Sequence, residues 1–284
     1  MGLKYVPDLL NNPAVYQRLD LNHFISTTFD APVAMKSPSK LIVICTVPRT
    51  AGNTLCRHMT MNGWGIPSEY FLPDMAIPLF NRWSGRHVRT MNDILLHKVE
   101  YGSHLMAKRS SNGVFSLKLF PHQWEHFIEA LSGRASAMDR HCVLLQRTNL
   151  VEQTISILAT MQTRRPSFSE LELSSLTKIT EVDHSLVRRT FHWLLEKENQ
   201  WPSLIAHFGG SLHRVRSEDL IENPAKTLSA LADYLGLPLN PSATRQSIDL
   251  EQNGAYQTNR YIKDEIRSRF SSLLEELKSA AQRS

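Results

Sequence analysis

The residue types best suited to binding a phosphate group follow one short apolar run, residues 41–45. That run is mostly β-branched and bounded by Pro48, which is typical of a buried strand that ends in a turn. The chain then continues as Arg49, Thr50, Ala51, Gly52, Asn53 and Thr54. Asn53 or Thr54 can begin a helix. In a tight strand-to-helix turn the free N–H groups and the positive end of the helix dipole favour an anion, so we predict a phosphate-binding turn with Arg49 at its mouth.

This turn is not the P-loop of nucleoside triphosphatases. That loop has the pattern G-x-x-x-x-G-K-[ST], and here both the first Gly and the Lys followed by Ser or Thr are missing. An ordinary strand-to-helix turn has the same mixture of apolar and small residues. The interpretation therefore needs support from the rest of the chain.

A second strand-to-helix junction carries its own basic residue. Residues 141–147 are predicted to form another strand, which ends in Arg147. Asn149 followed by Glu152 matches the capping-box pattern at the start of the next helix. In sheets built of parallel β-α units, ligands bind at the carboxyl ends of the strands. Because Arg49 and Arg147 both follow such ends, we expect them at one edge of the sheet.

The elements that would position these residues alternate along the chain. Strands are predicted at residues 41–45, 114–119, 141–147 and 212–215. Helices are predicted at about residues 53–62, 92–106, 121–131, 149–163, 184–208, 224–234 and 259–282. This alternation predicts an α/β fold with a central parallel sheet flanked by helices on both faces. We expect residues 1–40 to be an N-terminal extension and residues 41–284 to be a single domain with helical excursions.

Composition limits the class of protein and of partner. The chain has 284 residues, of which 42% are apolar, enough for a sizeable core. It has no run of about 18 uncharged apolar residues and no signal-peptide pattern, so we expect no transmembrane segment and a cytoplasmic location. The three cysteines fit buried thiols in a reducing compartment. The net charge of +5 is dispersed, which favours small anions over nucleic acid as partners.

Five stretches, in the same order along the chain, resemble the sulfotransferases that use 3′-phosphoadenosine 5′-phosphosulfate (PAPS), in particular the bacterial carbohydrate sulfotransferases of the trehalose 2-sulfotransferase type. Residues 48–56 resemble P-R-S-G-S-T-L-L-C, residues 66–71 G-x-P-x-E-Y-F, residues 112–119 N-G-V-F-G-x-K-L, residues 146–156 R-R-D-K-V-x-Q-A-V-S, and residues 217–220 Y-E-D-L. The first stretch departs by having Ala51, Gly52 and Asn53 where that family has Gly, Ser and Thr. The fourth has one arginine, Arg147, where the family often has two.

The resemblance implies a P-loop-like three-layer fold and transfer of a sulfuryl group from PAPS to a hydroxyl of a carbohydrate or glycolipid. The product would be adenosine 3′,5′-bisphosphate, and no metal would be required. Arg49 and residues 50–54 would bind the 5′-phosphate, and Arg49 would stabilise charge on the leaving oxygens. Arg147 and Ser156 would bind the 3′-phosphate. Glu69 matches the family's proposed catalytic base.

The resemblance leaves several points open. Lys118 matches a family lysine, but on a strand it could simply pair with a neighbouring carboxylate. Family members can form homodimers, so a homodimer is a possible state of this chain. The acceptor is expected to be a small molecule or a glycan. The segments at residues 72–110 and 164–182 match the family least, and we expect them to contact that acceptor.

Three alternatives come from other classes of protein. A P-loop-like small-molecule kinase would use ATP and Mg²⁺, although the turn lacks the Lys followed by Ser or Thr. A nucleotide-binding protein without turnover would keep the phosphate-binding turn and lose the chemistry. His122, Glu125 and His126 form the H-x-x-E-H pattern of inverted zinc proteases, although no third ligand motif is evident.

Overall fold

The structure, a computed structural model, describes residues 24–31, 37–131, 133–162, 182–253 and 260–281. In those residues five strands form one sheet in the order β2-β3-β1-β4-β5. The strands are β1 (Lys40–Cys45), β2 (Ser110–Ser111), β3 (Val114–Leu119), β4 (Asp139–Gln146) and β5 (Ser211–Arg216). β1 pairs in parallel with β3 and β4, β4 pairs in parallel with β5, and β2 pairs antiparallel with β3. The predicted α/β fold is confirmed. The sheet is mixed rather than wholly parallel, because β2 is antiparallel to its neighbour β3.

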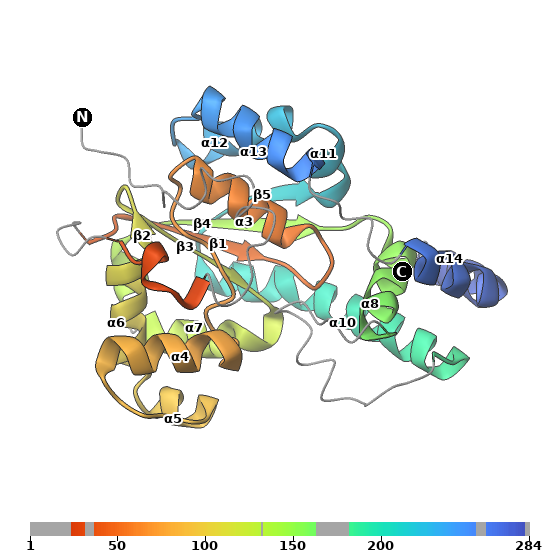
Figure 1. The fold of residues 1–284 in the computed structure, drawn as a ribbon, viewed down its shortest axis with the longest axis horizontal. Coiled ribbons are helices and arrows are strands. Elements are labelled where there is room, and N and C mark those ends of the chain that lie inside the picture. Colours follow the sequence, from red (N-terminus) through yellow and green to blue (C-terminus); the bar gives the residue numbers. More distant parts are fainter. Residues whose placement is uncertain (1–23, 32–36, 132, 163–181, 254–259, 282–284) are drawn as a thin grey trace.

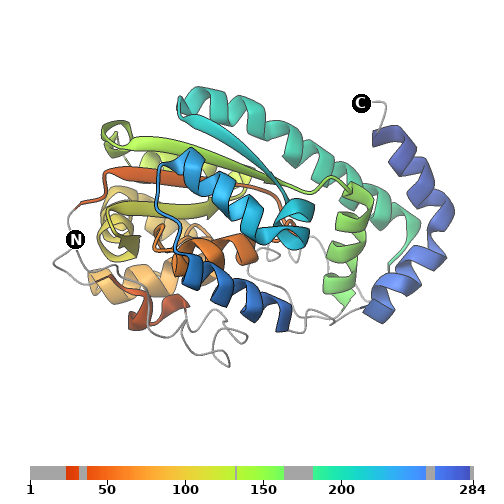
Figure 2. The same ribbon diagram turned by 90° about the horizontal axis from the view of Figure 1, so that it is seen from above.

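Helices cover both faces of the sheet (Figure 1). One layer holds α3 (Gly52–Met61), α11 (Ser217–Glu222), α12 (Pro224–Leu235) and α13 (Pro241–Asn253). The other holds α4 (Pro73–Ser84), α5 (Met91–Leu96), α6 (Lys98–Arg109), α7 (Trp124–Leu131) and α10 (His184–Phe208). α8 (Leu150–Gln162) follows β4, and α14 (Arg260–Arg269) and α15 (Ser271–Ala281) lie beside it at one end of the sheet (Figure 2). Short 3₁₀ turns complete the described elements, namely η2 (Thr27–Phe29), η3 (Pro121–Gln123) and η4 (Arg134–Ala137).

The central strand β1 is buried on both faces. Ile42 and Ile44 belong to the apolar core between the sheet and the layer of α3. Leu41, Val43 and Cys45 belong to the core on the side of α4 and α10. A parallel strand covered on both faces reads as a continuous apolar run rather than as an alternation, which is why residues 41–45 were predictable.

The edge strand β2 is an element that the apolar patterns do not predict. Asn112 and Gly113 have φ angles of 53° and 79°, as a type I′ turn requires, and they fold Ser110–Ser111 back onto β3. Two serines are too short and too polar a run to indicate a strand. The Asn-Gly dipeptide was the available signal for this hairpin.

Most predicted helices are confirmed, and the differences have local causes. No helix was predicted where α4 lies, because Pro73 and Pro78 are typical helix breakers. In the structure Pro73 is at the start of α4, where proline is tolerated, and Pro78 lies inside the helix. The helix predicted at residues 92–106 is two helices, since His97 has a non-helical conformation between α5 and α6. Likewise the helix predicted at residues 259–282 is divided into α14 and α15. None of the helices in the described ranges is long and apolar enough to cross a membrane.

Residues 24–31 precede β1 and pack against the layer of α4 and α6. Arg82 donates from one guanidinium nitrogen to both carboxylate oxygens of Asp30, at 2.8 and 3.0 Å. The fully buried Arg109 lies 3.1 Å from the same carboxylate. The division of the chain into an extension, residues 1–40, and a domain stays a prediction, since much of that extension lies outside the residues described.

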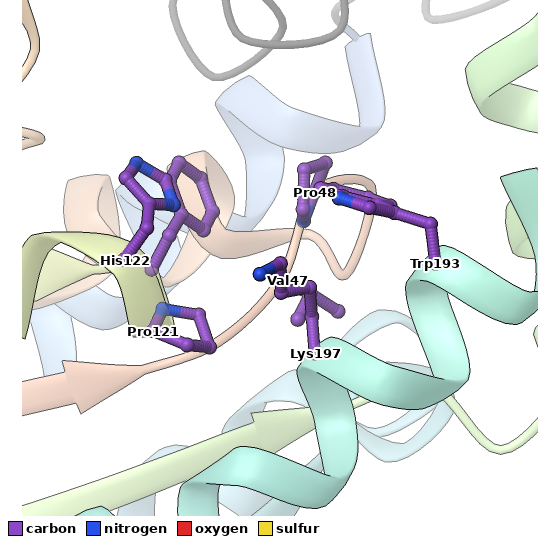
Figure 3. A pocket seen from close by; sticks show the side chains of 7 residues that line it. Val47, Pro48, Pro121, His122, Trp193 and Lys197 are labelled. Atoms are coloured by element: carbon purple, nitrogen blue, oxygen red, sulfur yellow. The ribbon is translucent and has the colours of Figure 1, made fainter.

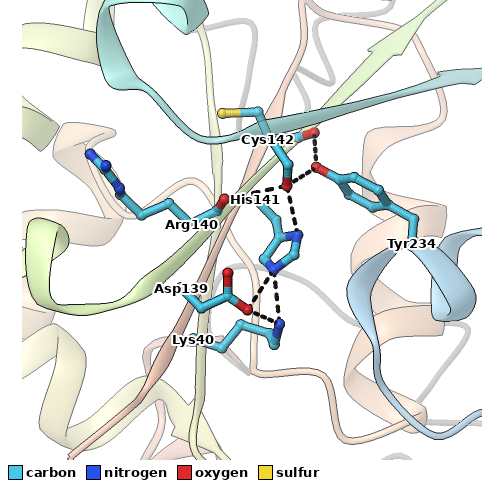
Figure 4. A network of polar contacts seen from close by, with 7 residues as sticks. Lys40, Asp139, Arg140, His141, Cys142 and Tyr234 are labelled. Carbon is cyan, nitrogen blue, oxygen red and sulfur yellow. Dashed lines mark hydrogen bonds and ion pairs between the residues drawn. The ribbon is translucent and has the colours of Figure 1, made fainter.

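Polar contacts join the amino ends of β1, β4 and β5 (Figure 4). Lys40 forms an ion pair with Asp139, and its Nζ lies 2.8 Å from His141 Nε2. On the other side of the ring, His141 Nδ1 lies 3.0 Å from Ser211 Oγ, which in turn lies 2.9 Å from the Tyr234 hydroxyl. These contacts fasten α12 to the amino edge of the sheet. Arg49 and Arg147 lie at the opposite, carboxyl edge.

Candidate active site

Three cationic side chains lie at the carboxyl ends of the three central strands. From β1 the chain passes to β3 on one side and later enters β4 on the other side. The carboxyl end of β1 is therefore a topological switch point, where α/β sheets bind their ligands. Arg49 follows β1, Lys118 lies near the end of β3, and Arg147 follows β4. The expectation that Arg49 and Arg147 share one edge of the sheet agrees with this arrangement.

The turn after β1 has an unusual backbone. Arg49 and Ala51 have φ angles of 67° and 60°, in the left-handed region that L-residues other than glycine rarely adopt. α3 begins at Gly52, one residue earlier than the first start we predicted, Asn53. Ala51 occupies the cap position and has no polar side chain with which to accept a hydrogen bond. The N–H groups of the first helical turn are therefore left without a side-chain cap at the place where we predicted a phosphate.

Neighbouring elements fix the carbonyl groups of this turn. Trp201 of α10 donates its indole N–H to the Thr46 carbonyl at 3.0 Å. Gln153 of α8 donates to the Pro48 carbonyl at 2.6 Å, and the hydroxyl of Ser217 donates to the Thr50 carbonyl at 2.7 Å. Three carbonyl groups of the turn are thus held by donors from other elements. Sequence reasoning assigned no such role to these three side chains, although all three match the family: Gln153 and Ser217 lie in stretches that resemble it, and Trp201 matches its Trp near the end of a helix.

Lys118 lies directly under the turn. A Cβ atom on Gly52 would approach within 3.0 Å of Lys118 Cδ, so the small residue makes room for the lysine stem. The Lys118 ammonium donates to Asn53 Oδ1 at 2.5 Å and forms an ion pair with Glu69. The side chains of Lys118 and Glu69 are only 4% and 2% exposed. A buried ammonium, a buried carboxylate and the phosphate-binding turn therefore form one contact group.

Glu69 reaches this group because its segment is hydrogen-bonded to β3. The Lys118 N–H donates to the Ser68 carbonyl at 3.0 Å, which sets the next residue, Glu69, beside the lysine side chain. Glu69 Oε1 faces the ammonium, whereas Oε2 has no hydrogen-bond partner among the described residues. A buried carboxylate with one unsatisfied oxygen is a suitable proton acceptor for a substrate hydroxyl.

The residues predicted to bind the 3′-phosphate also come together. Arg49 Nε donates to Ser156 Oγ at 3.0 Å, so the turn after β1 contacts the helix after β4. Arg147 is half-buried, and burial lowers the pKa of its guanidinium, while Glu218 and Glu152 act in the opposite direction and Arg49 lowers it further. Among the described residues no hydrogen bond or ion pair is found for the Arg147 side chain. This corner of the site therefore concentrates positive charge.

A small hollow opens beside the turn (Figure 3). It encloses about 200 Å³, the open solvent at its mouth included. Its walls are apolar, aromatic and cationic side chains from the ends of β1 and β3 and from α10, namely Val47, Pro48, Phe120, Pro121, His122, Trp193 and Lys197. Lys118 Nζ lies 5.9 Å from the centre of the Phe120 ring, which connects this hollow to the buried lysine and Glu69. Sequence reasoning did not group these seven residues into one site, because three separate elements supply them.

The predicted acceptor contacts stay a prediction, and the zinc pattern has a different local setting from that of a metal site. Residues 72–110 form α4 to α6 and the start of β2, and of the second segment, residues 164–182, all but the last residue lies outside the described ranges. His122 lies in the 3₁₀ turn before α7, where its ring stacks on Phe120. In the described part of the chain, no three His, Cys, Asp or Glu side chains are grouped as a metal site requires.

Comparison with known proteins gives one family match. The model of the family described as Stf0 sulphotransferase matches residues 41–267. No curated protein matches the chain. Among solved structures, it is similar to the sulfotransferase domain from the curacin biosynthetic pathway, with 16% identity over 83% of this chain and 99% of that one and a TM-score of 0.44. It is also similar to sulfotransferase STF9 from Mycobacterium avium, with 14% identity over 93% of this chain and 84% of that one and a TM-score of 0.45. A third similar structure is mouse sulfotransferase SULT7A1 complexed with PAP, with 11% identity over 91% of this chain and 92% of that one and a TM-score of 0.40.

Proposed function

Because the chain belongs to the Stf0 sulfotransferase family and is thus an enzyme of sulfuryl transfer, we propose that its donor is PAPS and that its acceptor is a hydroxyl of a carbohydrate or glycolipid. The observation that carries the proposal is the hydrogen bond between Arg49 Nε and Ser156 Oγ. It brings together the turn suited to a 5′-phosphate and the helix that bears a residue suited to a 3′-phosphate. PAPS carries phosphate groups at these two positions of one ribose.

The residues of the turn fit the 5′-phosphate end of the donor. The first N–H groups of α3, which have no side-chain cap, and the helix dipole favour a bound anion. The Arg49 guanidinium and the Lys118 ammonium add charge on either side of the turn. Bound there, PAPS supplies an activated sulfuryl group. The product left in the turn is adenosine 3′,5′-bisphosphate.

Glu69 is the residue that we assign to accept the proton of the acceptor hydroxyl. As the acceptor oxygen bonds to sulfur, the bond from sulfur to the 5′-phosphate oxygen breaks, and the electron pair remains on the phosphate. Arg49, Lys118 and the N–H groups of the turn stabilise that developing charge. Sulfuryl transfer resembles phosphoryl transfer in that positioning and charge stabilisation dominate the catalysis. In this proposal the cationic side chains and the N–H groups of the turn supply the stabilisation, with no metal ion.

We assign the acceptor to the hollow beside Trp193. The indole offers a flat apolar face on which a sugar ring can pack, and it lies near Pro48 at the mouth of the turn. Lys197 and His122 line the same hollow and offer polar contacts to hydroxyl groups. An acceptor bound there would approach Glu69 past Phe120, whose ring lies beside the Lys118 ammonium.

Calorimetric titration with adenosine 3′,5′-bisphosphate and with 5′-AMP, each with and without Mg²⁺, tests the donor class. We expect metal-independent binding that weakens strongly when the 3′-phosphate is missing, and a loss of this preference in Arg147→Ala. Equal binding of the two nucleotides would refute the PAPS proposal. Mg²⁺-dependent binding of ATP would instead favour the kinase alternative, and tight binding without turnover would favour the catalytically silent one.

A further inference from the structure

α14 is fastened to the helix that carries Ser156. Arg267 donates from Nε and NH2 to the two carboxylate oxygens of Glu152, each at 3.0 Å. Ile266, also on α14, is buried in an apolar cluster with Ile155 and Ala159 of α8. A bidentate ion pair and a shared apolar cluster fix both the position and the rotation of α14. Side chains next to Arg267 on its face are therefore placed reproducibly.

Lys263 is one helical turn before Arg267, on the face that meets α8. Residues four apart lie on one face of a helix, so Lys263 stands next to Arg267 on α14, just as Ser156 stands next to Glu152 on α8. Lys263 is half-buried, and the pKa of its ammonium is lowered first by burial and then by the positive charges of Arg49 and Arg147. Its amine therefore belongs to the cationic corner at the Arg49–Ser156 contact.

Three cations in one half-buried corner need an anion. In the described residues neither the Lys263 ammonium nor the Arg147 guanidinium has a hydrogen bond or ion pair. Glu152 lies nearby, but its two oxygens already accept from Arg267. Gathering like charges away from water is unfavourable unless an anion joins them. A phosphate dianion has the charge and the number of acceptor oxygens to satisfy several such donors at once.

We propose that Lys263 of α14 is a further ligand of the 3′-phosphate of PAPS, together with Arg147 and Ser156. This inference rests on the proposed function, because it takes the donor to be PAPS. It gives the C-terminal helices a role in the choice of nucleotide: they carry the ammonium that distinguishes a 3′-phosphorylated nucleotide from one without that group. No sequence pattern around Lys263 indicated this role.

The test compares Lys263→Met with Arg260→Met by calorimetry on the full chain. Both variants lose one positive charge from α14, but the Arg260 side chain is 86% exposed, and its contact among the described residues is a long one to Asp264, at 4.0 Å. We expect Lys263→Met to weaken binding of adenosine 3′,5′-bisphosphate by roughly ten-fold or more, the loss of one charge-assisted hydrogen bond, and to change binding of 5′-AMP by less than about two-fold. Arg260→Met should leave both affinities within about two-fold of the wild type. Lys263→Arg, which keeps a donor and the charge, should retain most of the affinity, and melting curves check that each variant folds.

The outcomes separate the inference from the proposed function. If the wild type prefers the 3′-phosphorylated nucleotide and Arg147→Ala removes that preference, but Lys263→Met does not reduce it, then the role of Lys263 is wrong and the donor proposal stands. Equal weakening of both nucleotides by Lys263→Met would also overturn the inference, because it would show a general charge effect. If the wild type has no preference, the donor proposal itself fails.

Discussion

The Nε–H of Arg49 donates to the Oγ of Ser156 at 3.0 Å and so joins two junctions that lie far apart in the sequence. Each junction by itself has the features of an ordinary strand-to-helix turn. Their contact gives the site two adjacent places for phosphate groups. It also makes the serine hydroxyl an orienting partner of the arginine as well as a candidate ligand.

Ser156→Ala should therefore weaken binding of adenosine 3′,5′-bisphosphate more than binding of 5′-AMP. The variant loses a hydroxyl donor to the phosphate and the acceptor that orients Arg49. We expect a loss of about 1 to 2 kcal/mol for the bisphosphate, measured by calorimetry. Ser279→Ala is the matched control, because among the described residues that hydroxyl donates to the Glu275 carbonyl of its own helix, α15, and its loss should change neither affinity. A loss of equal size for both nucleotides would contradict the assignment of Ser156 to the 3′-phosphate.

Glu69→Gln should abolish most of the turnover while leaving nucleotide binding close to that of the wild type. The amide cannot take the proton of the acceptor hydroxyl, and general-base catalysis contributes about 10²–10⁴-fold to a rate. Release of adenosine 3′,5′-bisphosphate from PAPS, followed with the acceptor present, measures the effect. The amide also leaves the buried Lys118 ammonium without its ionic partner, so a melting curve must show that the variant is folded.

Glu125→Gln is the control for that experiment. Glu125 is exposed on α7 and takes no part in the contacts that Lys118 makes with Glu69 and Asn53. It is the carboxylate that a zinc protease of the H-x-x-E-H type would use. We expect full sulfuryl transfer in Glu125→Gln. If Glu125→Gln lost activity and Glu69→Gln did not, our assignment of the chemistry to Glu69 would be wrong.

Ala51→Gly should stabilise the protein despite replacing an alanine at a helix start. Ala51 has a φ of 60°, and this left-handed conformation costs an alanine roughly 1 kcal/mol more than a glycine. Glycine is also the residue that the resembling family has at this position of the turn. We expect a gain of up to about 1 kcal/mol in the free energy of unfolding by urea titration, reduced by the greater freedom of glycine in the unfolded chain. Ala230→Gly, in the exposed middle of α12, should show the opposite sign.

How much the sequence predicts depends on whether a feature is local. The strand at residues 41–45, the helix His184–Phe208 with its Gly209 stop and the capping asparagine Asn149 are local patterns, and the structure contains each of them. The positions of Arg49 and Arg147 at one sheet edge also follow from a general rule of parallel sheets. These features needed no knowledge of tertiary contacts.

The rest of the site depends on contacts between distant segments. Gln153 reaches the turn, and Lys263 reaches the cationic corner, only because α8 and α14 pack where they do. Trp193 lines the hollow for the same reason. A side chain of this kind has no special sequence spacing relative to the turn, so periodicity and motifs give no signal for it. Even Glu69 was assigned by resemblance, and its ion pair with Lys118 followed only from the structure.

We expect the Glu198→Gln variant to be more stable than the wild type, with a larger difference in stability at alkaline pH than at acid pH. Burial raises the pKa of Glu198 from 4.5 to about 7, against the opposing effects of Gln146 and Arg214, and Oε1 has no hydrogen-bond partner in the described residues. The folded state therefore binds the proton more tightly than the unfolded state does, so stability falls as the pH rises from about 4.5 through 7. The amide does not titrate and keeps an oxygen that can accept from Gln146 Nε2. Thermal melts from pH 5 to pH 8 should show the gap between variant and wild type widening by up to about 3 kcal/mol. A gap between Glu198→Gln and the wild type that stays constant over this pH range would contradict the raised pKa of Glu198.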